Sequence, residues 1–213
     1  MKFADAVARW DARYRGAEDL LFGSEPNEWL RTSAVWLPEN ATIECLADGE
    51  GRNSTWLAGR HHQVRAFDVS SVAIAKLEAL AAERQVKVTA RVASLEQWID
   101  ECSQPEREAS LDAVVAIFIQ FADPLLRQRL FVAIEKVLKP GGLLIIEGYG
   151  SRQIVYRTGG PGVLENLYTP TMLSDAFPGW FTLASRDADK NITEGSAHVG
   201  RSHLISAVLR KSG

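Results

Sequence analysis

Two glycines and a carboxylate have the spacing of a nucleoside-binding site. Gly49 and Gly51 follow an apolar run at 41–47, and Asp68 comes 19 residues after Gly49, at the end of a second apolar run. Glycines one residue apart allow a tight turn that brings backbone N–H groups close to a ligand. A carboxylate about 20 residues later accepts the two hydrogen bonds of a ribose diol. The spacing therefore predicts ribose binding, although Asp68 is also suited to cap the helix that begins near Ser70.

The glycine turn also limits the kind of nucleoside ligand. Gly49-Glu50-Gly51 is followed by Arg52-Asn53-Ser54, so the third small residue of the dinucleotide fingerprint is missing. The carboxylate of Glu50, inside the turn, would also repel a diphosphate. A neutral or cationic adenosyl ligand with an amino-acid tail suits the turn better. A nicotinamide-dependent oxidoreductase is the alternative that the missing glycine disfavours.

These residues require a scaffold in which strands and helices alternate. Continuous apolar or β-branched runs predict parallel strands at 41–47, 63–69, 86–92, 111–119 and 143–149. Helical patterns connect them at 70–84 and 124–137, and Lys139-Pro140-Gly141-Gly142 is expected to end the second helix. Runs at 181–188 and 202–211 predict a final hairpin. The fold class is therefore α/β, a Rossmann-like, mostly parallel sheet of seven strands with an antiparallel C-terminal hairpin and helices on both faces.

Length and composition are those of one soluble domain. The chain has 213 residues, 46% hydrophobic and 24% charged, and a net charge of −3. There is no basic excess to bind nucleic acid and no apolar run long enough to span a membrane. The two cysteines, Cys45 and Cys102, lack metal-ligand spacing and are too few for a disulfide framework. We expect a cytoplasmic monomer or homodimer that binds no metal, with a helical cap or lid over 1–38 and an α/β core over 39–213.

Four segments resemble, in order, the motifs of the class I S-adenosylmethionine-dependent methyltransferases. They are IECLADGEGRNSTWLA, VRAFDVS, LDAVVAIFIQF and VLKPGGLLIIEGY. The amino-terminal WDARYRG…LFGSEPNEWL is similar to the small bacterial tellurite-resistance-type branch. The resemblance covers nearly the whole chain and implies S-adenosyl-L-methionine as cofactor, S-adenosyl-L-homocysteine as product and a small-molecule methyl acceptor. A thiol or a tellurium or selenium oxyanion is the candidate acceptor.

By position, the resemblance assigns cofactor-binding roles to the strand ends and the amino-terminal segment. Gly49 and Gly51 would lie under the methionine part of the cofactor, with Asp48 holding its ammonium group. The remaining residues would bind the ribose, the adenine or the region of the sulfur, or would close over the cofactor: Asp68, Val69, Ser94, Leu95, Ile117, Phe118, Phe22, Gly23 and Pro26.

The acceptor side of the site has fewer local signals. Tyr149 leaves the fifth strand, and His198 and Arg201 resemble the polar end of the hairpin that lies near the acceptor in relatives. His198 would act as an acid or base near neutral pH, and Arg201 would bind an anionic acceptor. Both residues also suit the surface of a hairpin. Trp10 and Tyr14 are expected to dock the amino-terminal helix or to form a substrate cage. A non-catalytic cofactor-binding regulatory or interaction protein of the same fold is the alternative function.

Overall fold

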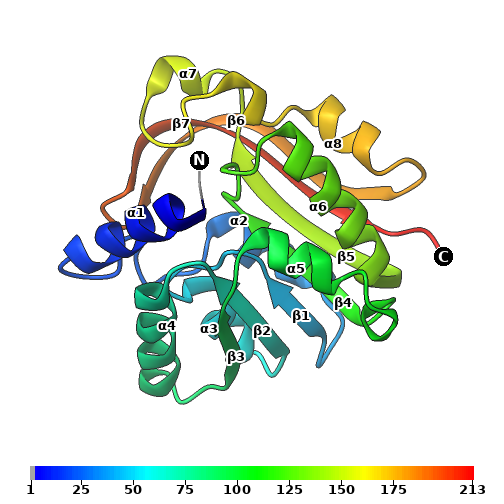
Figure 1. Cartoon of the computed structure of the whole chain (residues 1–213). Coiled ribbons are helices and arrows are strands. Elements are labelled where there is room, and N and C mark those ends of the chain that lie inside the picture. Colours follow the sequence, from blue (N-terminus) through cyan, green and yellow to red (C-terminus); the bar gives the residue numbers. More distant parts are fainter. Residues whose placement is uncertain (1–2) are drawn as a thin grey trace.

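The sheet has seven strands in the order β3-β2-β1-β4-β5-β7-β6, with helices on both of its faces (Figure 1). The computed structural model describes residues 3–213, with side chains from residue 7 onward. Strands β1 to β5 are parallel, β7 is antiparallel to β5, and β6 is antiparallel to β7. The predicted seven-stranded, mostly parallel sheet with an antiparallel C-terminal hairpin is confirmed.

The elements have the following bounds. The strands are β1 (Thr42–Cys45), β2 (Gln63–Asp68), β3 (Val88–Val92), β4 (Leu111–Ile117), β5 (Leu138–Tyr149), β6 (Phe181–Glu194) and β7 (His198–Arg210). The helices are α1 (Phe3–Gly16), α2 (Glu28–Ser33), α3 (Arg52–Ala58), α4 (Ser71–Glu83), α5 (Leu95–Glu101), α6 (Pro124–Val137), α7 (Gln153–Tyr156) and α8 (Pro170–Ala176). Three short 3-10 helices are η1 (Ala34–Trp36), η2 (Pro105–Arg107) and η3 (Leu164–Asn166).

Local capping residues decide where the connecting helices begin. The side chains of Ser70, Ser94 and Asp123 accept backbone N–H groups in the first turns of α4, α5 and α6. Helix α6 ends at Val137, as expected, but the next residues already belong to β5. The segment at 139–142 is therefore part of the strand rather than a helix ending. An irregular register with β4 between Leu111 and Ala113 accommodates its proline and glycines.

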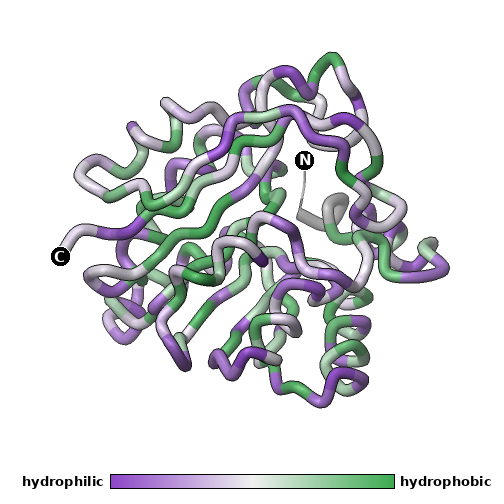
Figure 2. The backbone as a smooth tube through the Cα atoms, turned by 180° about the vertical axis from the view of Figure 1, so that it is seen from behind, coloured by the Kyte–Doolittle hydropathy of each residue, from purple (hydrophilic) through white to green (hydrophobic). Residues whose placement is uncertain are grey.

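Strand residues alternate between two hydrophobic cores, one on each face of the sheet. In β4, Val114 and Ala116 face a cluster that includes residues of α5, α6 and α8. Ala113 and Val115 face a second cluster with residues of α2, α3 and α4. Figure 2 shows the hydrophobic colour concentrated on the central strands. The sheet order reverses between β1 and β4, which is where ligands bind in folds of this kind.

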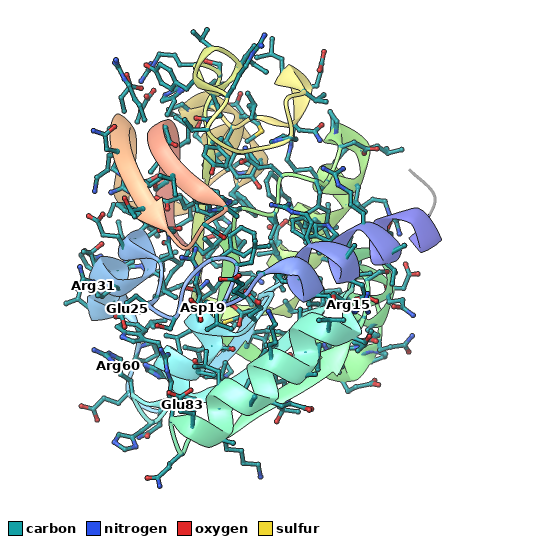
Figure 3. All side chains as sticks on the ribbon, turned by 90° about the vertical axis from the view of Figure 1, so that its left-hand side faces the viewer. Arg15, Asp19, Glu25, Arg31, Arg60 and Glu83 are labelled. Atoms are coloured by element: carbon teal, nitrogen blue, oxygen red, sulfur yellow. The ribbon has the colours of Figure 1, made fainter. Side chains whose placement is uncertain are left out.

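The amino-terminal segment lies over this reversal point. Helix α1 packs on α4, and the hairpin of β6 and β7 lies above the segment that follows α1 (Figure 3). Lys76 of α4 donates to the Tyr14 carbonyl at 2.7 Å, and the Leu21 carbonyl accepts the N–H groups of Ser196 and Ala197 at the hairpin tip. The segment is thus attached to both sides of the site. None of the helices in residues 3–213 is long and apolar enough to cross a bilayer.

Candidate active site

The glycine turn between β1 and α3 requires both of its glycines. Gly49 and Gly51 have positive φ angles of +62° and +86°. A Cβ on Gly51 would overlap the side chain of Leu77, and one on Gly49 would lie 2.8 Å from the Tyr14 hydroxyl oxygen. The turn is therefore enclosed by α4 on one side and by α1 on the other. Tyr14, predicted as a docking contact or cage residue, lies directly against Gly49.

Asp68 fastens the glycine turn to the end of β2. One of its carboxylate oxygens accepts the Gly49 N–H at 3.0 Å and the other accepts the Ser70 N–H at 2.9 Å. Burial raises the pKa of Asp68 to about 6, against the backbone hydrogen bonds that lower it. Each oxygen keeps a second lone pair for a further donor. Asp68 therefore lies at the predicted place, beside the turn.

Asp48 is a second acidic group in the turn. Its carboxylate accepts the Ser54 N–H at 3.2 Å in the first turn of α3, and burial raises the pKa of Asp48 to about 6. Among the described residues neither Asp48 nor Asp68 forms an ion pair with a basic side chain. Two buried carboxylates without cationic partners favour a ligand that carries positive charge over a phosphate.

The carboxylate of Glu50 is bonded to residues outside the glycine turn, whereas the sequence suggested that its charge faces a ligand there. Its carboxylate accepts the Leu21 N–H at 2.6 Å and pairs with Lys76 at 2.9 Å. The ion pair offsets the repulsion that we expected between Glu50 and a diphosphate. The residue instead joins the amino-terminal segment to α4, so the missing third glycine and the two unpaired aspartates carry the argument about ligand charge.

The predicted adenine side lies at the ends of β2 and β3. Val69 is half-buried after β2, and Ser94 forms a capping box with Gln97 at the start of α5. The capping box uses both the N–H and the hydroxyl oxygen of Ser94. The Leu95 N–H, in the first turn of α5, is the donor left for a ligand on this side. Contacts of these residues with adenine stay predictions.

The acceptor side is an aromatic cluster assembled from four distant segments. The His198 ring lies 4.6 Å from the rings of Phe22 and Phe118 and 5.7 Å from that of Tyr149, between ring centroids. Phe118 follows half-buried Ile117 at the end of β4 with φ +56°, and its ring lies 4.8 Å from that of Tyr149. The structure therefore brings together two of the three predicted catalytic residues, His198 and Tyr149.

Two buried polar atoms of this cluster have no hydrogen-bond partner. They are the Tyr149 hydroxyl and His198 Nδ1, which find no partner among the described residues. His198 Nδ1 lies 3.7 Å from Glu194 Oε2, which is too long for a hydrogen bond, and Arg52 Nη2 lies 2.7 Å from the same oxygen. Buried polar atoms are paired in the great majority of native structures. Unpaired ones that meet in one cluster indicate a binding surface.

Burial, more than the surrounding charges, keeps the His198 ring neutral at pH 7. Burial lowers the pKa of His198 and Arg52 lowers it further, whereas Glu194 raises it. Burial alone would raise the pKa of Glu194, but His198 and Arg52 outweigh it and bring that pKa down to about 2. A neutral imidazole beside a fixed carboxylate is suited to accept a proton.

Arg201 does not join this cluster, and its predicted binding of an anionic acceptor stays a prediction. Its exposed guanidinium pairs with Asp189 at 2.8 Å and lies over the Tyr156 ring. The physical reason is the alternation of side chains along β7, in which residues an odd number apart point to opposite faces. Arg152 pairs with the same Asp189 at 3.0 Å.

The two other predicted lid residues are structural contacts in this arrangement. Gly23 has φ +75° and a Cβ there would lie 3.2 Å from the Gly195 backbone nitrogen, so it allows the hairpin tip to approach. Pro26 is buried just before α2. Their predicted closure over a cofactor stays a prediction, whereas Phe22 contacts both Tyr14 and His198 and so links the two sides of the site.

Sequence reasoning missed the polar residues that hold the two sides together. The Asn27 side-chain amide donates to Glu147 at 2.7 Å and Glu194 at 3.1 Å, and its backbone N–H donates to Asn53. Arg52 donates to the Phe22 carbonyl as well as to Glu194. Asn27 has the local signal of a helix cap, but Arg52 and Glu194 have none, because their partners lie far away in the sequence.

Residues 45–142 match the family model that is described as a methyltransferase domain. This segment of the chain is similar to a methyltransferase domain. The match begins in β1, includes the glycine turn and Asp68, and ends inside β5. It confirms the methyltransferase class predicted for the enzyme. No curated protein matches the chain in sequence. Among the described residues there is no group of three or more potential metal ligands.

Solved structures show the same fold. A protein reported for the conversion of a disulfide bond into a thioacetal group during echinomycin biosynthesis aligns with a TM-score of 0.75 at 16% identity, over 97% of this chain and 92% of that one. A SAM-dependent methyltransferase from Methanosarcina mazei gives 0.67 at 18%, over 88% and 99%. TehB from Haemophilus influenzae gives 0.69 at 14%, over 86% and 61%. At these identities the likeness establishes the fold.

Proposed function

We propose that this protein is an S-adenosyl-L-methionine-dependent methyltransferase that acts on a small molecule. The observation that carries the proposal is the glycine turn fastened to Asp68 at the reversal point of the sheet, inside the segment that matches the methyltransferase model. We further propose that it acts in the cytoplasm as a monomer or homodimer and binds neither nucleic acid nor a membrane.

The residues of the turn fit this cofactor on physical grounds. Gly49 and Gly51 allow the turn to pack closely against Tyr14 and Leu77 and give it the positive φ angles that a tight turn needs. Asp68 keeps acceptor capacity for a ribose diol, and Asp48 has the charge to hold an ammonium group. The unpaired charge of these carboxylates suits a cofactor with a sulfonium and an amino-acid tail, and opposes a pyrophosphate.

The residues of this chain would then bind and orient rather than react. When bound, the cofactor supplies a methyl group on a positively charged sulfur, which is transferred by in-line displacement. Phe22 and Phe118 exclude water near the transfer site, and Gln120 fixes the backbone of Tyr149 by accepting its N–H and donating to its carbonyl. Holding the reacting atoms about 3–3.5 Å apart is worth up to about 7–11 kcal/mol of the barrier.

The acceptor candidates are a thiol and a tellurium or selenium oxyanion. TehB from Haemophilus influenzae shares the fold, and so does the protein reported for the conversion of a disulfide bond into a thioacetal group. The amino-terminal segment of this chain supports a small acceptor, because its Leu21 carbonyl joins it to the hairpin tip beside the aromatic cluster.

Thermal unfolding with ligands tests the cofactor. We expect S-adenosyl-L-homocysteine at about 100 times its Kd to add about 2.7 kcal/mol to the free energy of unfolding, and to raise the Tm by roughly 5–11 °C. NAD at the same concentration should leave the Tm unchanged. Asp68→Asn should weaken the binding of S-adenosyl-L-homocysteine at least about tenfold, since hydrogen bonds to charged groups contribute roughly 1.5–3 kcal/mol.

A matched control is the exposed Asp100→Asn, which removes one charge far from the turn. It should leave ligand binding unchanged. A Tm rise with NAD instead of S-adenosyl-L-homocysteine would overturn the proposed cofactor. Tight binding without transfer of a labelled methyl group to any acceptor would favour the non-catalytic alternative.

A further inference from the structure

The charges on the acceptor side restrict the chemistry of the methyl acceptor. Arg152 and Arg201 pair with Asp189 at the surface. Of the two arginines that lower the pKa of His198, Arg52 pairs with Glu194 at 2.7 Å, and Arg13 lies over the rings of Trp10 and Phe22. Among the described residues, three of these four arginines are therefore already paired with a carboxylate. A neutral acceptor needs no counter-charge in a buried site.

The same cluster leaves a proton acceptor and a donor without partners. Tyr149 is 1% exposed and His198 is 8% exposed. Neither the hydroxyl nor His198 Nδ1 is hydrogen-bonded. Phe22 and Phe118 surround them with apolar surface. These surroundings favour a ligand that carries a hydrogen-bonding group on an apolar or aromatic body.

Glu194 is placed to stabilise positive charge on the imidazole. Its Oε2 lies 3.7 Å from His198 Nδ1, and its position is fixed by Arg52 and by the Asn27 amide. Because Nδ1 faces the carboxylate, Nε2 is the ring nitrogen left to take a proton from a ligand. Carboxylates behind histidines set the tautomer and stabilise the imidazolium in acid–base sites.

We propose that the methyl acceptor presents an uncharged, weakly acidic hydroxyl or thiol on an aromatic or apolar body, and that His198 takes its proton while Glu194, held by Arg52, is the positioning residue. The acceptor's O–H or S–H bond breaks and the proton goes to His198 Nε2. The acceptor atom forms the bond to the methyl carbon, and the leaving sulfur keeps the electron pair of the broken C–S bond. This inference rests on the proposed function and excludes tellurite and selenite.

The groups that face His198 from all sides decide its ionisation. They are Glu194 on β6, Arg52 on α3, Arg13 on α1 and Tyr149 on β5. Glu194 raises the pKa of His198, whereas burial and the two arginines lower it. Removing the Glu194 charge should therefore lower the pKa of the His198 ring, which stays in place as a weaker base.

Ionisation of a bound phenol tests this inference without turnover. The full chain is saturated with S-adenosyl-L-homocysteine, and 4-nitrophenol and 4-nitrothiophenol are titrated by absorbance, since their ionised forms absorb at longer wavelength. We expect binding of at least one probe with at least a threefold rise in its ionised fraction, measured at a fixed pH about one unit below the pKa of the free probe. His198→Gln should abolish the rise, Glu194→Gln should reduce it, and Glu194→Asp should restore part of it.

The controls separate this inference from the proposed function. His61→Asn replaces an exposed turn histidine with φ +67°, which asparagine tolerates, and should keep the full effect. Circular dichroism checks that each variant is folded. Stabilisation by S-adenosyl-L-homocysteine without probe binding, or binding without the rise in ionisation, overturns the inference alone. Transfer of a labelled methyl group to tellurite or selenite also overturns the inference. If S-adenosyl-L-homocysteine does not bind to the unmodified protein, the proposed function itself is overturned.

Discussion

The two sides of the candidate site differ in how completely their polar groups are paired. On the cofactor side, the carboxylates of Asp68 and Glu50 bond with both oxygens. On the acceptor side, the Tyr149 hydroxyl and His198 Nδ1 are buried without partners. On the cofactor side the fold thus gives every carboxylate oxygen of Asp68 and Glu50 at least one donor, whereas on the acceptor side two buried polar atoms have no partner. We infer that the first determines stability and the second determines which molecule reacts.

The largest expected effect comes from filling the glycine turn. Gly51→Ala should lower the free energy of unfolding by about 2–5 kcal/mol, because the new Cβ overlaps Leu77 and φ is +86°. It should also abolish measurable binding of S-adenosyl-L-homocysteine. Urea unfolding and calorimetry measure the two effects.

The matched variant is Gly141→Ala in β5. Gly141 has a similar φ of +77°, but a Cβ there would have nothing within 4 Å. We expect a loss of about 1–2 kcal/mol from backbone strain alone and unchanged ligand binding. If both variants lose the same stability, the close packing of the cofactor side is not what makes Gly51 necessary.

The pH dependence of stability should have opposite signs on the two sides. The pKa of Asp68 is raised to about 6, so the folded chain binds a proton that the unfolded chain releases near pH 4, and this stabilisation is lost as the pH rises through 6. Relative to the unmodified protein, Asp68→Asn should therefore gain about 1 kcal/mol between pH 5 and pH 7.5. Urea unfolding at the two pH values measures this change.

His198 should show the reverse. Its pKa is lowered, so the unfolded chain binds a proton near pH 6 that the folded chain does not, and the stability is lost as the pH falls. His198→Gln should therefore gain stability relative to the unmodified protein as the pH falls from 7.5 to 5. Equal signs for the two variants would show that the sides do not differ in this way.

The smallest effect is expected from removing the unpartnered hydroxyl. Tyr149→Phe should leave the free energy of unfolding unchanged or raise it by up to about 1 kcal/mol, because no hydrogen bond is lost and a buried polar atom is removed. Tyr156→Phe is the control, since its hydroxyl donates to Asp189 at 2.6 Å and its loss should destabilise by up to about 1 kcal/mol. A clear loss in Tyr149→Phe would mean that its hydroxyl is paired.

The sequence predicted the cofactor side better than the acceptor side for a physical reason. The glycine turn, Asp68 and the caps of α4 and α6 depend on neighbours within a few residues or one strand, so their patterns are visible locally. Arg52 and Glu194 meet across 142 residues. The face that Arg201 occupies could not be predicted locally, because it depends on the register of a long hairpin. The lengths of β5 and β7 were underestimated, because backbone pairing continues in both strands beyond the apolar runs that predicted them.

The hairpin extends well past the sheet that carries it. Pairing of β7 with β5 runs from Leu204 to Arg210, whereas pairing of β7 with β6 continues to His198. The outer half is thus a two-stranded ribbon, a structure that is marginal in water by itself. Its tip is clamped by the Leu21 carbonyl. Amide hydrogen exchange along this ribbon should therefore be slow while the Leu21 carbonyl holds the tip, and fast if that contact is lost.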